Sequence, residues 1–196
     1  MKIVEKAKFK TQIEALENAV PHRTVDVDLT TMKKSNPIDV RYENSMMIMQ
    51  AEGDQSGMWT AEKFSAPLVV KLRAKTDSTN IRLCYNNAEI VFNWECNYDE
   101  IQVDYMTGCI EKGGSHTLTE YGDGYNGRIP ENEFVDIEWF ISPEIMIIKA
   151  NGELRWVGDD AEFLGKVASP TQPEPVRVNP AWGSVVTVES LSVSEV

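Results

Sequence analysis

The sequence has few residues of the kinds that cross-link small proteins or bind metals. Its 196 residues include three cysteines, with no Cys-x-x-Cys spacing, and two histidines, His22 and His116, that are 94 positions apart. An odd number of unpaired cysteines favours reduced thiols, so we expect Cys84, Cys96 and Cys109 to be free. Because the two histidines lack further ligands at metal-binding spacing, we expect no metal site and no bound cofactor; a calcium ion held by Asp99, Glu100, Asp104 or Asp123 is the open alternative.

Long apolar runs and an excess of basic residues are also missing. No stretch approaches the roughly 18 apolar residues of a membrane-spanning helix, and no apolar run follows a basic start as in a signal peptide. Lys and Arg number 19 against 31 Asp and Glu, a formal net charge of −12. A negative field of this size repels nucleic acid and anionic lipid. We therefore expect a cytoplasmic protein that binds neither nucleic acid nor membranes.

What is present is the composition of an ordinary globular protein, with 42% hydrophobic and 26% charged residues. The length favours one domain, residues 1–196. Residues 5–20 carry the main helical pattern, because Phe9, Ile13, Leu16 and Val20 fall on one helical face. We expect residues 1–21 to form an N-terminal helical segment that packs on the domain and ends at Pro21.

After residue 22 the hydrophobic residues recur with period two, which is typical of half-buried strands. Ten to twelve short strands are expected, separated by turn signals and without a βαβ pattern. Residues 144–149 lead into Asn151-Gly152, a type I′ hairpin signal, and the chain returns through residues 154–156. The pattern predicts an all-β fold, an antiparallel sandwich or barrel with one short helix.

Three segments resemble parts of a known superfamily. Residues 132–156 (NEFVDIEWFISPEIMIIKANGELRW) resemble the late hairpin of concanavalin A-like lectin/glucanase jelly rolls, including laminin G-like domains. Residues 176–196 resemble their closing strand, which returns beside the N-terminal strand. Residues 81–108 are similar to the middle of an uncharacterised bacterial group with this architecture. The resemblance implies a two-sheet jelly-roll sandwich whose relatives bind glycans, cleave them or act as interaction modules.

The resemblance also provides a test for catalysis. Hydrolases of this superfamily carry Glu-x-Asp-x-x-Glu on one strand, where alternation puts the first two acids on one face. The only Glu-x-Asp here is Glu52-Gly53-Asp54, and Gly57 stands where the last Glu should be. The missing motif argues against an enzyme of this type.

Tryptophans are candidates for sugar binding, because flat aromatic rings suit the apolar faces of sugar rings. Trp94 and Trp139 share their strand faces with Ile or Phe, which favours a place in the core. Trp59 and Trp182 lie beside glycines and turns. For these two residues, core packing and ligand stacking both remain open.

Polar residues alternate with apolar ones along four predicted strands, and they include Arg73, Arg82, Asn93, Glu95, Asp136 and Glu138. If the four strands are neighbours in one sheet, these side chains converge on a concave surface. A groove for a polar ligand, most simply a carbohydrate, is one interpretation. The other is a solvated face with cross-strand ion pairs, each contributing roughly 0.2–1 kcal/mol.

The leading hypothesis is a non-catalytic carbohydrate- or small-ligand-binding module. Its predicted ligand-binding residues are Arg73, Arg82, Asn93, Glu95, Glu138, Trp59 and Trp182. One alternative is a glycoside hydrolase or lyase with an atypical acid pair such as Glu95 and Glu138, and another is a protein-interaction or sensory domain. Carboxylates roughly 5–5.5 Å or 6.5–9.5 Å apart would favour a hydrolase, whereas carboxylates paired with arginine would favour binding or structure.

Overall fold

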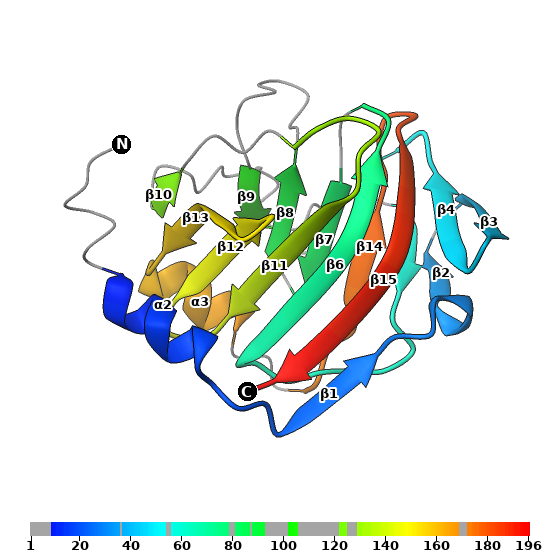
Figure 1. The fold of residues 1–196 in the computed structure, drawn as a ribbon. Coiled ribbons are helices and arrows are strands. Elements are labelled where there is room, and N and C mark those ends of the chain that lie inside the picture. The colour runs from blue at the N-terminus through cyan, green and yellow to red at the C-terminus, as the bar shows by residue number, and fades with distance from the viewer. Residues whose placement is uncertain are drawn as a thin grey trace.

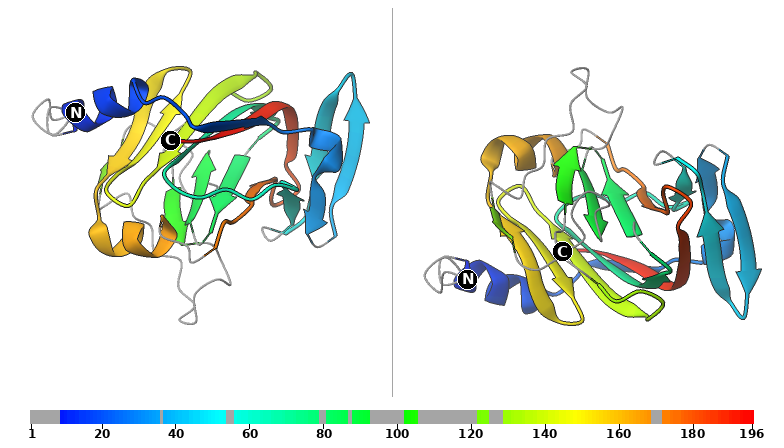
Figure 2. Two further views of the ribbon diagram at one scale, coloured as in Figure 1. Left: turned by 90° about the horizontal axis from the view of Figure 1, so that it is seen from below. Right: turned by 90° about the horizontal axis from the view of Figure 1, so that it is seen from above.

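The computed structural model describes residues 9–35, 37–53, 56–78, 81–86, 88–92, 102–105, 122–124, 129–168 and 172–196. Two antiparallel β-sheets, A and B, stack face to face (Figures 1 and 2). The expected two-sheet antiparallel sandwich is confirmed. Among the described residues, no helix is long and apolar enough to cross a lipid bilayer.

Sheet A has nine strands. Eight follow one another across the sheet: β10 (Gly122–Gly124), β13 (Glu153–Gly158), β12 (Met146–Ala150), β11 (Val135–Ile141), β6 (Leu68–Thr76), β15 (Val185–Glu195), β4 (Met46–Gln50) and β3 (Asp39–Glu43). The ninth, β1 (Arg23–Asp26), pairs with the second half of β15, whereas β4 pairs with its first half. The N-terminal and C-terminal strands are therefore adjacent, as predicted.

Sheet B has six strands in the order β2 (Lys33–Ser35), β5 (Gly57–Trp59), β14 (Val176–Asn179), β7 (Ile81–Tyr85), β8 (Ala88–Phe92) and β9 (Gln102–Tyr105). Residues 176–196, which resemble a single closing strand, in fact supply one strand to each sheet. β14 lies in the middle of sheet B, and only β15 returns beside β1.

The hairpin predicted at Asn151-Gly152 is confirmed. Both residues have positive φ, 51° and 74°, and they join β12 to β13 in antiparallel register. Positive φ at both central positions is the geometry of a type I′ turn, which Asn and Gly adopt at little cost.

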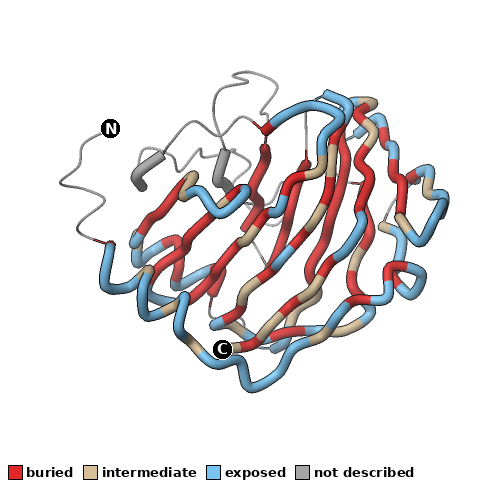
Figure 3. The backbone as a smooth tube through the Cα atoms, viewed as in Figure 1, coloured by how far each residue is buried: buried red, intermediate tan, exposed pale blue. Residues whose placement is uncertain are grey.

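The main core lies between the sheets (Figure 3). Trp139, Tyr85 and Phe92 are among its largest fully buried side chains, so the expectation that Trp139 packs in the core is confirmed. β7 and β8 are buried along their whole length, on both faces. This double burial is unusual for an antiparallel sheet, which commonly leaves one face in water.

The N-terminal helix is shorter than its sequence pattern. α2 covers Lys10–Glu17 and lies on the outer face of sheet A, where Phe9, Ile13 and Leu16 join a second, smaller apolar cluster (Figure 2). Val20 lies outside the helix and is 86% exposed, contrary to the expected apolar face. A capping side chain is absent at Phe9, so docking on the sheet has to stabilise the helix.

A second helix, α3 (Ala161–Val167), was not expected, because this stretch lacks a long periodic pattern. Asp160 caps it: its Oδ1 accepts a hydrogen bond from the Phe163 amide at 2.7 Å. Phe163, Leu164 and Val167 enter the main core. A short 3₁₀ turn, η1 (Leu29–Thr31), follows β1 and is capped in the same way by Asp28.

Candidate functional site

The face of sheet B that points away from sheet A carries a compact group of polar and aromatic side chains. Val178 and Leu83 face the core, so the alternate residues of their strands lie on the outer face. Antiparallel register places four of them side by side across β5, β14, β7 and β8: Trp59, Arg177, Cys84 and Glu89. In the adjoining row, Asn179 lies opposite Arg82. We call these six residues the sheet B cluster.

Glu89 lies between two guanidinium groups. Arg82 Nη1 is 3.4 Å from Glu89 Oε2, and Arg177 Nη2 is 3.6 Å from Glu89 Oε1. The three side chains are only 2–5% exposed. Buried charges are tolerated when they are paired, so these contacts hold the three groups in a fixed arrangement.

Cys84 is a buried free thiol within this cluster and is not part of the apolar cluster between the sheets. Its Sγ accepts from Arg177 Nη2 at 3.1 Å and donates to Glu89 Oε1 at 3.3 Å. Burial raises the pKa of the thiol well above its usual range, and the nearby Arg177 charge only partly opposes this. A protonated thiol is a poor nucleophile, which argues against cysteine catalysis here.

Trp59 is the half-buried, aromatic end of the row. The Arg177 guanidinium lies over its ring, 5.1 Å from the centroid. β5 and β14 approach closely here, because a Cβ built on Gly57 would lie 2.5 Å from Asn179 Cβ and 2.7 Å from the Val178 carbonyl oxygen. Only glycine fits at that position. The close approach fixes the strand that carries Trp59 against the strand that carries Arg177.

Arg73 and Glu138, two of the predicted ligand-binding residues, lie on the other side of the sandwich. The four strands expected to be neighbours belong to two sheets: β6 and β11 to sheet A, β7 and β8 to sheet B. The expected convergence on one surface is therefore wrong. Arg73 pairs with Asp136 and Glu189 on the outer face of sheet A, where these side chains are 40–62% exposed.

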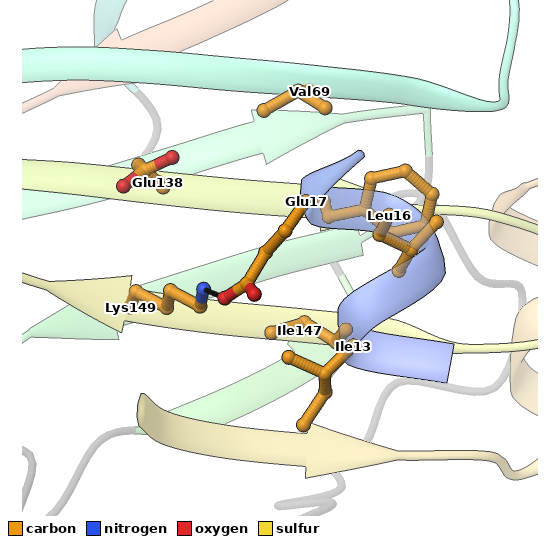
Figure 4. Close-up of a pocket in the computed structure, with 8 residues that line it drawn as sticks. Ile13, Leu16, Glu17, Val69, Glu138, Ile147 and Lys149 are labelled. Atoms are coloured by element: carbon orange, nitrogen blue, oxygen red, sulfur yellow. Dashed lines mark hydrogen bonds and ion pairs between the residues drawn. The ribbon is translucent and has the colours of Figure 1, made fainter. Parts of the chain in front are cut away.

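Glu138 lines a pocket between α2 and sheet A (Figure 4). It pairs with Lys71 at 3.5 Å. The close-up shows Ile13 and Leu16 of α2 over Ile147, with the Glu17–Lys149 ion pair at the rim. Apolar and charged contacts of the docked helix thus occupy the outer face around β11 and β12.

The remaining predicted residues lie elsewhere. Trp182 is in the turn between β14 and β15 and is 58% exposed. Asn93 and Glu95 fall outside the described residues, as do Cys96, Cys109 and His116. His22 is exposed, 3.9 Å from Glu195. In the described part of the chain, no group of three or more His, Cys, Asp or Glu side chains is placed to hold a metal ion.

Sequence reasoning missed Glu89, Arg177 and Asn179. The signal was present, because Arg177 and Asn179 alternate with Val176 and Val178 in a strand pattern, and Glu89 precedes Ile90 in the same way. The pattern gives the face of each residue. It does not give the order β5-β14-β7-β8, which brings residues from distant parts of the chain together.

No family model and no curated protein matches the sequence. Solved structures match the fold. A Bacillus subtilis protein of unknown function with a galectin-like fold has a TM-score of 0.62 and 8% identity, covering 90% of this chain and 96% of that one. A Bacillus licheniformis β-glucanase has a TM-score of 0.56 and 9% identity, covering 88% and 98%.

A third structure comes from work on endo-acting O-glycanases that human gut bacteria use to begin mucin breakdown. It has a TM-score of 0.58 and 11% identity, covering 90% of this chain and all of that one. Identities this low establish the fold alone. The chain therefore shares the two-sheet sandwich fold of these structures, the fold that the resemblance of residues 132–156 implied.

Proposed function

We propose that the protein binds carbohydrate, without cleaving it, on the outer face of sheet B. The observation that carries the proposal is the partly exposed Trp59 at the end of a row of fixed hydrogen-bonding side chains. Trp59 offers an aromatic surface for a sugar ring. Lys33, its exposed cross-strand neighbour on β2, offers a donor for hydroxyl groups, while the buried Arg177 holds the Trp59 ring in place.

The burial of the cluster suits binding. Arg82, Glu89 and Arg177 hold one another in place, so the surface is organised before a ligand arrives and little side-chain freedom is lost on binding. Proteins with the same fold support carbohydrate as the ligand class, since they include a β-glucanase and a protein from work on O-glycanases. Glycan binding is thus a chemistry that this architecture is known to support.

The pairing of Glu89 favours binding over hydrolysis. A glycosidase needs one carboxylic acid that gives a proton to the leaving group. Glu89 instead lies within 3.6 Å of two guanidinium groups, which engage both of its carboxylate oxygens. Among the residues of sheet B with described side chains, it is the one acid on the outer face.

One observation favours a glycoside hydrolase as the second candidate. The backbone of β9 brings Asp104 to the register position directly opposite Glu89. Directly opposed residues of antiparallel strands have Cβ atoms roughly 4.5–5.5 Å apart. An acid pair at these two positions is therefore compatible with the fold.

Titration calorimetry with short oligosaccharides from β-glucan and from mucin tests the binding proposal. Trp59→Ala should weaken binding about ten-fold, since an aromatic contact contributes about 0.5–1.5 kcal/mol beyond the area it buries. Tyr42→Ala is the matched control, because Tyr42 is an exposed aromatic residue on β3 of sheet A. Equal affinities for the two variants, or no binding by the wild-type protein, would contradict the proposal.

A reducing-sugar assay on the same polymers separates the two candidates. Sugar release by the wild-type protein that Glu89→Gln abolishes would establish the hydrolase and overturn the non-catalytic proposal. Glycan binding without sugar release by either protein would support the non-catalytic proposal.

A further inference from the structure

The turn between β14 and β15 places a tryptophan in an unfavourable backbone conformation. Trp182 has φ 53° and Gly183 has φ 77°. Ser184 N donates to the Ala181 carbonyl oxygen at 3.0 Å, closing a four-residue turn. Positive φ at both central positions makes it a type I′ turn, in which the first central residue is commonly Asn, Asp or Gly.

Trp182 is the exception among comparable positions in this chain. The other described non-glycine residues with positive φ are Asn44, Ser45, Asn86, Asn132 and Asn151. The Asn151-Gly152 turn has almost the same φ values, 51° and 74°, as Trp182-Gly183. A bulky residue is a genuine outlier in this region, because its Cβ crowds the backbone. Of the six described non-glycine residues in this conformation, four are asparagine and one is serine, so Trp182 is the one bulky side chain among them.

Burial of the indole does not compensate for this backbone strain, because Trp182 remains 58% exposed. The turn is nevertheless held firmly. Gly183 N donates to the Ala51 carbonyl oxygen at 2.9 Å, and Gln50 Nε2 donates to the Gly183 carbonyl oxygen at 2.8 Å. Ser184 Oγ donates to the Ala181 carbonyl oxygen at 2.7 Å. Strain that persists in an over-determined turn points to a function for the strained residue.

We propose that Trp182 is a second stacking surface for the same ligand, and that the ligand is a chain of several sugar units. This inference rests on the proposed function. Trp59 lies opposite Arg177 on β14, and Trp182 follows Arg177 by five residues along the chain. At about 3.3 Å per residue Trp182 lies at most about 16 Å from Arg177, and neighbouring strands are roughly 5 Å apart, so Trp59 and Trp182 lie within about 21 Å of each other. A chain of several sugar units can bridge a span of this size.

The surroundings of Trp182 favour a sugar over a protein partner. The other large hydrophobic side chains described as exposed are Val20 and Tyr42, which lie before β1 and on β3. Protein-binding surfaces commonly present a contiguous apolar patch. A single rigid aromatic ring near the polar side chains of Gln50 and Asp77, which bond to this turn and to the start of β15, suits a sugar ring better.

The test compares a disaccharide with a hexasaccharide of whichever glycan the wild-type protein binds. We expect the wild-type protein to bind the hexasaccharide about ten-fold more tightly. In Trp182→Asn and Trp182→Ala, the hexasaccharide affinity should fall to that of the disaccharide, whereas Tyr42→Ala should keep the gain. Trp59→Ala should lose affinity for both sugars.

Thermal melting supplies a second readout. Both Trp182 variants lose the indole, but only asparagine tolerates positive φ, so Trp182→Asn should melt about 2–4 °C above Trp182→Ala. If both Trp182 variants still bind the hexasaccharide more tightly than the disaccharide, the inference is overturned while the binding proposal stays intact. A different outcome is self-association that depends on Trp182, seen by light scattering, with equal affinities for the two sugars in the wild-type protein. That result also overturns the inference and assigns the turn to a protein contact. Absence of any glycan binding defeats the proposed function itself.

Discussion

Replacing Arg82 by methionine is the most direct test of how the sheet B cluster is held together. The Arg82 guanidinium is 2% exposed and 3.4 Å from the Glu89 carboxylate. Arg82→Met keeps much of the side-chain volume and removes the charge. Removing one partner of a buried ion pair costs about 3–5 kcal/mol, because the other charge stays buried.

Arg177, at 3.6 Å, still neutralises Glu89 in this variant, so we expect a cost near the lower end, about 3 kcal/mol. For a domain of this size, each kcal/mol shifts the melting temperature by about 2–4 °C, which gives a decrease of about 6–12 °C. Arg41→Met is the matched control. Arg41 pairs with Glu43 at 2.9 Å but is 62% exposed, and exposed pairs contribute at most about 1 kcal/mol.

Calorimetric melting of the three proteins at pH 7 measures the difference. A melting temperature for Arg82→Met within about 2 °C of the control would refute the reasoning. Arg82 would then be an available ligand-binding group, as its place in an alternating strand first indicated. A large decrease would identify it as a structural partner that positions Glu89.

Three further predictions follow from local geometry. Burial raises the pKa of Tyr85 to about 12, so folding stability should fall between pH 10 and pH 12 as the unfolded chain ionises first, and Tyr85→Phe should lose less stability over that range in thermal melts. Iodoacetamide should leave Cys84 unmodified in the folded protein and alkylate it in urea, as peptide mass spectrometry would report; equal labelling in both states would contradict its burial. Gly57→Ala should destabilise the protein by about 1–3 kcal/mol through its clash with Asn179, whereas Gly165→Ala, with open space in α3, should stabilise it by about 0.5–1 kcal/mol; equal melting temperatures would contradict the crowding.

The sequence was sufficient for the elements whose signals are local. Alternation around Arg73 identified β6, and Asn151-Gly152 identified the β12–β13 turn, because strand faces and turn conformations depend on near neighbours. The short helix α3 was missed, since seven residues with one capping aspartate give a weak periodic signal. Its stability comes from Phe163 and Leu164 entering the core, which is a tertiary effect.

The candidate site was harder to predict because alternation assigns a residue to a face but not to a sheet. β6 and β7 are consecutive and both alternate, so the sequence favours a hairpin with Arg73 and Arg82 on one surface. The chain instead crosses to the other sheet between them, and β14, almost 100 residues later, becomes the neighbour of β7. Arg82 therefore meets Glu89 and lies opposite Asn179, far from Asp136 on sheet A.

Burial of the polar face of β7 and β8 is the feature that no local pattern indicated. Arg82, Cys84 and Glu89 occupy positions that an exposed antiparallel sheet would give to water, yet each is almost fully buried. Charged side chains persist in such a place only when partners compensate for lost hydration, and those partners come from two other strands. A site of this kind depends on the register of four strands together, so substitutions at its members should couple to one another more strongly than to residues on sheet A.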